Sequence, residues 1–339
     1  MQGLQTPKPE TDEQLGAKKA NLLVTNGSHR RTMRWAQLDK SDSGESTDFK
    51  FYWDDWNDNV PVCQSVDDVF LLCNTFLNLS GVRIGQDPSL LTKLARIGKK
   101  NLADDPSEAN YRRWIDLCRR LLVPALSLLK ANPGVVNEVF EMLKLYPTRT
   151  RYNLYAEWFN GQISRLPEIK AAFDQSRSET KDVLKRISKT NTKQMARQLA
   201  KVACSSPGIV YNVALGQIES YDNLIEVVVE CARYFTYLGY DVLCWSLLSA
   251  LGGRGRDRTQ ADGMLTSPWL RALSNFAGKV FKRYSFMNPT PILQYVAYQL
   301  RTGNSNDLEV LEQLVSNMGG IAADTTFNDT QLSAMSGGK

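Results

Sequence analysis

The chain has 339 residues and a mass of 38.2 kDa, which is enough material for about two domains. Hydrophobic residues make up 42% and charged residues 23%, the mean hydropathy is −0.34, and no apolar run approaches the length of a membrane span. The formal net charge of +5 permits nucleic-acid binding without demanding it. Because the first residues contain no apolar signal segment, we expect a protein of the cytoplasm or nucleus.

Cysteine and histidine chemistry is poorly supported by the sequence. The six cysteines form no C-x-x-C pair and mostly lie among apolar residues, as buried free thiols do. They are Cys63, Cys73, Cys118, Cys204, Cys231 and Cys244. The single histidine, His29, lies in a polar stretch, which disfavours histidine-based hydrolase and metal sites.

Residues 1–60 are predicted to form a mobile arm, because residues 1–48 are polar and contain too few large apolar side chains to offset the entropy cost of ordering. The arm ends in an aromatic-acidic patch at residues 49–56. This patch could dock on a neighbouring surface, or it could pack on the first helices of the same chain.

From about residue 62 onward the hydrophobic period is helical, and the alternating runs typical of strands are missing. Residues 65–68 resemble a capping box that begins a helix through Leu79, with Ser80-Gly81 as its stop. In the next strong segment a single apolar face comprises Trp114, Leu117, Cys118, Leu121 and Leu122. Pro124 lies inside this pattern, so we expect a kink there, with residues 125–130 continuing at an angle.

Proline and glycine then recur at helix-length intervals. The positions are Pro133-Gly134, Pro147, Pro207-Gly208, Gly239, Pro268 and Asn288-Pro289. Residues 224–238 form an apolar stripe that Gly239 can end, and Val242, Trp245 and Leu248 begin the facing helix of an αα-hairpin. Because several such pairs follow one another without a strict repeat, the sequence predicts an all-α protein, a HEAT-like α-solenoid of antiparallel helix pairs rather than a four-helix bundle.

No motif for catalysis or for a cofactor is present. Residues 253–258 lack the third glycine of G-x-G-x-x-G and follow a helix instead of a strand, and residues 337–339 have no Walker context. The paired acids precede or open helices, where they favour the N-terminal dipole. Large aromatic residues at helical spacing (Trp114, Trp158, Trp245 and Trp269) are interpreted as core anchors. An enzyme is therefore the least favoured class.

Two basic features are candidate partner-binding sites. The first consists of two consecutive helices whose basic residues lie opposite apolar ones, with Asn191 and Gln194 as a capping box for the second helix. Its candidate residues are Lys185, Lys189, Lys193, Arg197 and Lys201. The second is a glycine-rich, adaptable loop with Arg254, Arg256 and Arg258. Either feature could bind RNA phosphate or an acidic partner, and the alternative for both is an ordinary solvated surface.

Several ordered segments resemble a known family. They are residues 143–147, 151–152, 154–155, 158, 185–186, 189, 221–225, 238–243, 293–297 and 331–338. Together they make the chain from about Leu90 to its end resemble the middle region of the THO complex subunit 2 family, the large scaffolds of transcription-coupled mRNA export. Residues 178–318 also resemble the HEAT-type middle domain of translation initiation scaffolds, a fold that holds DEAD-box helicases by both lobes.

The resemblance implies a scaffold without catalytic activity in the nucleus, part of the THO/TREX machinery of transcription elongation, mRNA processing and export. Its implied partners are other THO subunits and the DEAD-box RNA helicase of the export pathway. A direct RNA-binding helical module and a purely structural segment remain alternatives.

Four regions are expected along the chain. Residues 1–60 are the mobile arm, 61–177 a helical scaffold segment, 178–320 a HEAT-type middle domain, and 321–339 a C-terminal extension.

Overall fold

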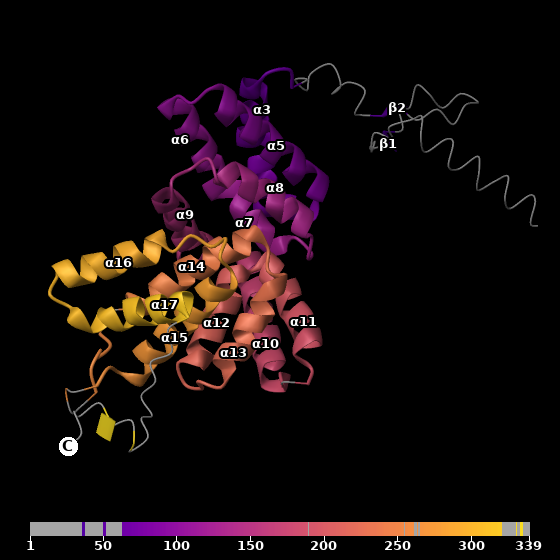
Figure 1. Ribbon diagram of the computed structural model, residues 1–339. Helices are drawn as coiled ribbons and strands as arrows, with labels where there is room; N and C mark the ends of the chain where they lie inside the picture. The colour runs from indigo at the N-terminus through magenta and orange to yellow at the C-terminus, as the bar shows by residue number, and fades with distance from the viewer. Residues whose placement is uncertain are drawn as a thin grey trace, which may run out of the picture. The chain divides into compact units, whose positions relative to one another are not determined.

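The computed structural model in Figure 1 describes residues 36–37, 50–51, 63–188, 190–253, 255–260, 263, 265–320, 330 and 333–334. By its internal contacts the chain divides into two compact units, Met1–Asp68 and Val69–Lys339. In the first unit, strands β1 (Ala36–Gln37) and β2 (Lys50–Phe51) pair antiparallel. The rest of the predicted arm and of the aromatic-acidic patch lies outside the described residues.

In the first half of the described chain, α-helices of 3 to 17 residues are joined by π and 3₁₀ turns. The α-helices are α3 (Val66–Leu72), α4 (Asn78–Ser80), α5 (Pro88–Asp104), α6 (Glu108–Leu117), α7 (Val123–Ala125), α8 (Pro133–Leu143) and α9 (Thr148–Asn160). The π turns are Cys73–Leu77 and Cys118–Leu122, and the 3₁₀ turns are Gly81–Gln86, Leu126–Leu128 and Gln162–Arg165. Helices α5 and α8 pack against each other.

The predicted start and stop of the first helix are confirmed. The Ser65 hydroxyl accepts a hydrogen bond from the Asp68 amide at 3.3 Å, and the Asp68 carboxylate accepts one from the Ser65 amide at 2.8 Å, which is a reciprocal capping box. The α-helical stretch ends at Ser80, and Gly81, whose φ of 52° suits a residue without a side chain, begins the 3₁₀ turn that follows.

The apolar face predicted around Trp114 is buried throughout: Trp114, Leu117, Cys118, Leu121 and Leu122 are each at most 2% exposed. Pro124 changes the helix geometry, since a π turn precedes it and a 3₁₀ turn follows. The predicted continuation of the helix to Lys130 is wrong. The last helical turn ends at Leu128, because the backbone of Leu129 is extended.

The second half of the described chain contains longer helices. They are α10 (Pro167–Arg186), α11 (Thr192–Ser205), α12 (Pro207–Ile218), α13 (Leu224–Cys231), α14 (Tyr237–Leu251), α15 (Pro268–Arg283), α16 (Thr290–Arg301) and α17 (Leu308–Gly319), with 3₁₀ turns Ala232–Tyr234 and Ser305–Asp307. Proline opens several of them at the first helical position, where its missing N–H costs nothing. Within the described residues no helix is both long and apolar enough to cross a membrane.

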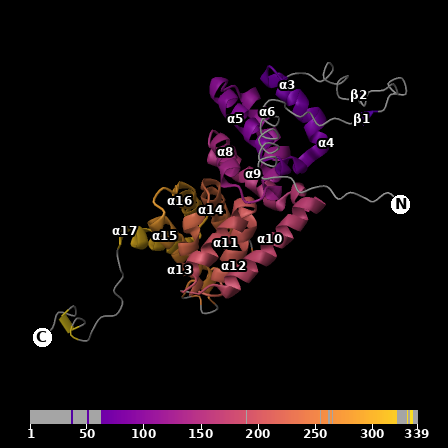
Figure 2. The same ribbon diagram turned by 90° about the vertical axis from the view of Figure 1, so that its right-hand side faces the viewer.

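All of these helices except α16 stack in two layers, because α10 packs on α12, α12 on α14, α11 on α13, α13 on α15, and α15 on α17. Helices α10, α12 and α14 form one layer, and α11, α13, α15 and α17 form the other, with α10 and α11 in contact across the layers (Figure 2). Such stacking of neighbours is the arrangement of a solenoid. The predicted all-α, HEAT-like solenoid is thus confirmed.

The αα-hairpin expected around Gly239 is wrong in detail. Helix α13 ends at Cys231, and Gly239 lies in the first turn of α14, where its amide donates a hydrogen bond to the Thr236 hydroxyl at 3.1 Å. Thr236 is therefore the N-cap of a new helix. Helix α13 packs mainly on α11 and α15.

Aromatic residues fill the core where α9 meets α14. The Trp158 indole N–H donates a hydrogen bond to the Ser127 hydroxyl at 2.8 Å, and the Phe159 ring lies 5.7 Å from that of Trp245. Trp114, Trp158 and Trp245 are buried, as predicted for core anchors. Trp269 is only partly buried, and the Arg256 guanidinium lies over one face of its ring.

A buried ion pair also joins α9 to α14. The Arg151 guanidinium donates to the Asp241 carboxylate at 2.8 Å, each side chain is 14% exposed, and the Tyr155 hydroxyl donates to the same carboxylate at 2.8 Å. This cluster lies on both sides of the expected boundary at residue 178, which itself falls inside α10. The division into 61–177 and 178–320 remains a prediction.

Candidate partner-binding surface

Helix α11 carries only positive charge. Its charged residues are Lys193, Arg197 and Lys201, and all three are exposed. The sequence around it is equally one-sided, because residues 183–218 contain no Asp or Glu. The basic residues of that stretch are Lys185, Arg186, Lys189, Lys193, Arg197 and Lys201. We call the exposed side chains of Lys193, Arg197 and Lys201, together with Lys185 at the end of α10, the α11 basic surface.

The predicted residues of this surface do not all point the same way. Arg197 lies over the Tyr234 ring, 5.7 Å from its centroid, whereas Lys201 lines a groove between α10, α11 and residues 127–131. Lys185 is exposed in the last turn of α10 and does not line that groove. Lys189 lies outside the described residues. No described acid forms an ion pair with Lys185, Lys193, Arg197 or Lys201, so these cations are available to an external anion.

The turn between the two basic helices is built by Asn191, but not as predicted. Its side-chain oxygen accepts a hydrogen bond from the Ser188 amide at 2.7 Å, and its amide nitrogen donates to the Arg186 carbonyl at 2.8 Å. It makes no side-chain cap on α11, so the predicted capping box with Gln194 is wrong. The side chain instead ties the end of α10 to the start of α11 and so orients the basic helix.

The groove beside Lys201 has a volume of about 680 Å³ and mixed charge. Its basic lining residues are Lys130, Arg186 and Lys201, and its acidic ones, Glu179 and Asp182, both lie on α10. Because these acids partly offset the cations, the groove is a weaker anion site than the exposed side of α11.

A contrasting pattern occurs farther along the same layer. On α15, Lys279 forms an ion pair with Glu226 of α13 at 3.1 Å, and Arg283 pairs with Glu230. The cations of α15 are thus partly neutralised by the preceding helix of the layer. On α11, by contrast, none of the three cations has an ion pair with a described acid, and the helix itself contains no acid.

The arginine loop is tied down by the chain itself, contrary to the adaptable loop that the sequence predicts. Arg256 donates to both carboxylate oxygens of Glu219, at 2.9 and 2.7 Å, and its guanidinium lies 4.2 Å from the Trp269 ring centroid. The bidentate hydrogen bonds with Glu219 raise the pKa of Arg256. Arg254 lies outside the described residues.

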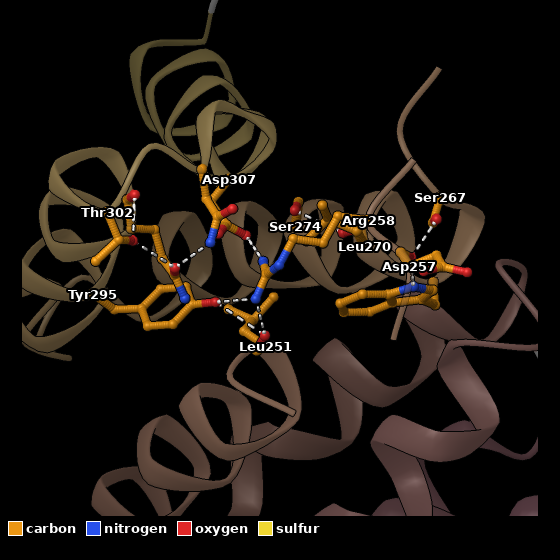
Figure 3. A network of polar contacts seen from close by, with 12 residues as sticks. Leu251, Asp257, Arg258, Ser267, Leu270, Ser274, Tyr295, Thr302 and Asp307 are labelled. Atoms are coloured by element: carbon orange, nitrogen blue, oxygen red, sulfur yellow. Dashed lines mark hydrogen bonds and ion pairs between the residues drawn. The ribbon is translucent and has the colours of Figure 1, made fainter. Parts of the chain in front are cut away.

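Arg258 points inward, as Figure 3 shows. It pairs with Asp307, which is completely buried, and also donates to the Leu251 carbonyl and the Tyr295 hydroxyl at 3.2 Å each. Burial raises the pKa of the Asp307 carboxyl, and the charge of Arg258 opposes that rise. Arg258 is a structural cation that joins α14, α16 and the 3₁₀ turn before α17, so we do not include it in the surface for a partner.

The structure also contains an aromatic pocket that the sequence did not predict. Its volume is about 320 Å³, and Tyr237 and Phe286 line it. Each of these two residues is 58% exposed, and their ring centroids lie 6.2 Å apart. The Lys144 ammonium lies 5.7 Å from the Tyr237 ring. The available signal in the sequence was a pair of aromatic residues, one at the start of α14 and the other in the connection between α15 and α16.

Comparison with known proteins decides the family. A family model described as the THO complex subunit 2 N-terminus matches residues 2–197, more than half of the chain. The chain belongs to the THO complex subunit 2 family. A second model, described as a transcription- and export-related complex subunit, matches residues 199–274.

Curated THO complex subunit 2 proteins from distant organisms agree. The chain is 35% identical to the Homo sapiens protein over 283 residues, which are 80% of this chain and 18% of that protein. It is 32% identical to the Saccharomyces cerevisiae protein over 297 residues and 36% identical to the Arabidopsis thaliana protein over 216 residues. These matches cover 86% and 64% of this chain, and 18% and 12% of the relatives. The matched part of the chain therefore spans 12 to 18% of the length of these relatives.

The two matched ranges can be located relative to the α11 basic surface. The two matched ranges meet at residue 198, inside α11, so the basic helix lies where both models join. Neither model is described as a catalytic family.

Burial raises the pKa of the Cys118, Cys231 and Cys244 thiols to about 12, which leaves them protonated and unreactive. The chemistry that the surface supports is electrostatic binding of anionic groups.

Proposed function

We propose that this chain is a segment of the non-catalytic scaffold subunit of a nuclear THO/TREX complex that acts in transcription elongation, mRNA processing and export. The family match and the names of its relatives, as subunits of a THO complex, support this role. A two-layer solenoid suits it, because stacked helices expose long faces to which several partners can bind. Other THO subunits are its expected partners.

The second part of the proposal is that the scaffold binds and regulates the DEAD-box RNA helicase of the export pathway. A rigid solenoid that contacts both helicase lobes would favour a half-open state and speed the exchange of nucleotide and RNA. The observation that carries the contact site is the α11 basic surface, whose cations have no described acidic partner within the chain. We assign the contact to Lys185, Lys193, Arg197 and Lys201, with Lys189 as the residue between the helices.

The test is the RNA-dependent ATPase rate of this helicase with and without the chain, together with a pull-down at two salt concentrations. The unmodified chain is expected to bind and to stimulate. Lys193→Glu with Arg197→Glu should weaken binding at least about tenfold, because it replaces two attractive charges by two repulsive ones. Lys93→Glu with Lys100→Glu is the matched control, since both lysines are exposed on α5 and the charge change is the same.

Direct RNA binding is a second candidate, favoured by the acid-free stretch of residues 183–218. If RNA binds there, the logarithm of its association constant should fall linearly with the logarithm of salt concentration, and the α11 double variant should reduce that slope. Equal binding and stimulation by the α11 and α5 double variants would reject the α11 basic surface. No binding to helicase or RNA would leave a structural segment.

A further inference from the structure

The sequence contains the pattern Lys-Arg-x-Ser twice, at residues 185–188 and 282–285. In both copies the two basic residues close the last turn of a long helix, and an exposed serine follows two residues after the helix ends. Serine/threonine kinases with acidic substrate clefts select basic residues two and three positions before the acceptor serine, by charge complementarity. From the sequence alone the two copies are equivalent.

The structure leaves the first copy accessible. Arg186 donates only to the Asp182 carbonyl of its own helix, at 3.0 Å, and neither it nor Lys185 forms an ion pair with a described acid. The Ser188 hydroxyl shares a hydrogen bond with the Thr190 hydroxyl at 2.9 Å. The turn is held by exposed hydrogen bonds to Asn191, and such bonds open locally at small cost.

The structure holds the second copy in place. Arg283 pairs with Glu230, so one of the two recognition cations is engaged. Tyr284, between the cations and Ser285, is 7% exposed and donates a hydrogen bond to the Val229 carbonyl at 2.7 Å. A kinase that binds this segment in an extended form has to pull Tyr284 out of the core and break the ion pair.

We propose that Ser188 is a phosphorylation site for a serine/threonine kinase directed by basic residues, and that the phosphate switches off the α11 basic surface. The Ser188 Oγ forms a bond to the γ-phosphorus of ATP, the bond between that phosphorus and the β,γ-bridging oxygen breaks, ADP leaves, and the hydroxyl proton passes to the kinase. The choice of Ser188 rests on the accessibility of its segment. The switch rests on the function proposed above.

The effect of the phosphate follows from charge. A phosphoserine carries about −1.5 to −2 charges at neutral pH. Residues 183–218 hold six basic residues and no acid, so their formal charge falls from +6 to about +4. Ser188 also precedes the N-terminus of α11 by a few residues, where negative charge is favoured. The phosphate would compete for the cations that an external anion needs.

The site is tested with the whole chain, ATP and the catalytic subunit of the cyclic-AMP-dependent kinase, with phosphorylated residues mapped by mass spectrometry. The initial rate at Ser188 is expected to exceed that at Ser285 by at least about tenfold, the equivalent of one strong hydrogen bond. Ser188→Ala should remove most of the phosphate and Ser285→Ala should remove little. Equal or faster modification of Ser285, or no modification of either serine, would overturn the assignment.

The switch is tested by a pull-down of the helicase with the Ser285→Ala variant of the chain, before and after this variant is phosphorylated. Phosphorylation is expected to weaken binding at least about fivefold, the size of one exposed charge interaction. Unchanged binding would overturn the switch. If the unmodified chain bound neither helicase nor RNA, the proposed function and the switch would both fail, while the kinase rates would still decide which serine is modified.

Discussion

Two arginines in one loop show how the neighbourhood of a residue decides its role. Arg258 is 16% exposed at its side chain and pairs with a fully buried Asp307, whereas Arg256 is 36% exposed and pairs with Glu219, which is 18% exposed. A buried charge without its partner costs far more than an exposed one, because water cannot replace the lost contact. The two residues are only two positions apart, yet their contributions to stability should differ strongly.

Arg258→Ala is therefore expected to lower the free energy of unfolding by about 3–5 kcal/mol, since it leaves the Asp307 carboxylate buried and unpaired. Arg256→Ala should cost only about 1 kcal/mol. Urea unfolding followed by circular dichroism measures both. Similar losses for the two variants would show that Asp307 finds another partner or reaches solvent.

Asp307 should also make stability depend on pH. Burial raises its pKa above the usual value of 3.8, so the folded protein holds the proton more tightly than the unfolded chain. This stabilisation is complete below the unfolded pKa and is lost as pH rises through the folded pKa. Asp307→Asn should remove that downward component from the dependence of unfolding free energy on pH. Parallel pH profiles for the wild type and Asp307→Asn would contradict the assignment.

At the scale of elements, close approach of helices α15 and α17 depends on a glycine. A Cβ atom added at Gly278 would overlap the Gln313 carbonyl of α17, which is backbone and cannot rotate away. At Gly216, in α12, an added Cβ would meet nothing within 4 Å. The first glycine is required by packing, and the second only lowers helix propensity.

Gly278→Ala is expected to destabilise the protein by about 1–3 kcal/mol, because α17 has to move away from α15. Gly216→Ala should stabilise it by up to about 1 kcal/mol, because alanine loses less entropy in a helix. Thermal unfolding of both variants measures the difference. A neutral Gly278→Ala would mean that α17 shifts freely, and that the end of the solenoid is not rigidly packed.

At the scale of the whole molecule, the contacts of unit Val69–Lys339 join its first helices to the solenoid. The Arg151–Asp241 pair and the aromatic core of Phe159 and Trp245 connect α9 to α14, and α10 runs without interruption across residue 178. Contacts of this kind make two segments unfold together.

We therefore expect a chain of residues 63–320 to unfold in a single transition, with coincident curves from tryptophan fluorescence and circular dichroism. Arg151→Ala should lower the midpoint of that transition without splitting it, because the change removes one partner of a buried pair. Two separated transitions would instead support independent domains divided near residue 178.

Much of the fold could be predicted from the sequence because its signals are local. The capping box at Ser65, the prolines that open α8, α12 and α15, and the apolar face around Trp114 each depend on residues within a few positions of one another. The break between α13 and α14 could not be predicted in the same way. The apolar stripe runs through it, and only the extended backbone at Thr236 and the packing of α13 between α11 and α15 divide it.

The sequence by itself determined the helical class, the family resemblance and the basic character of α11, since composition and helical period act over one turn at a time. The tertiary structure alone decided which cations remain available. Arg258 meets Asp307 across 49 positions of sequence, and Arg256 meets Glu219 across 37. In the second Lys-Arg-x-Ser copy, Arg283 and Tyr284 are likewise held by Glu230 and Val229, more than 50 residues before them. The partner of a charge or of a tyrosine hydroxyl is set by neighbours in space, which local sequence does not specify.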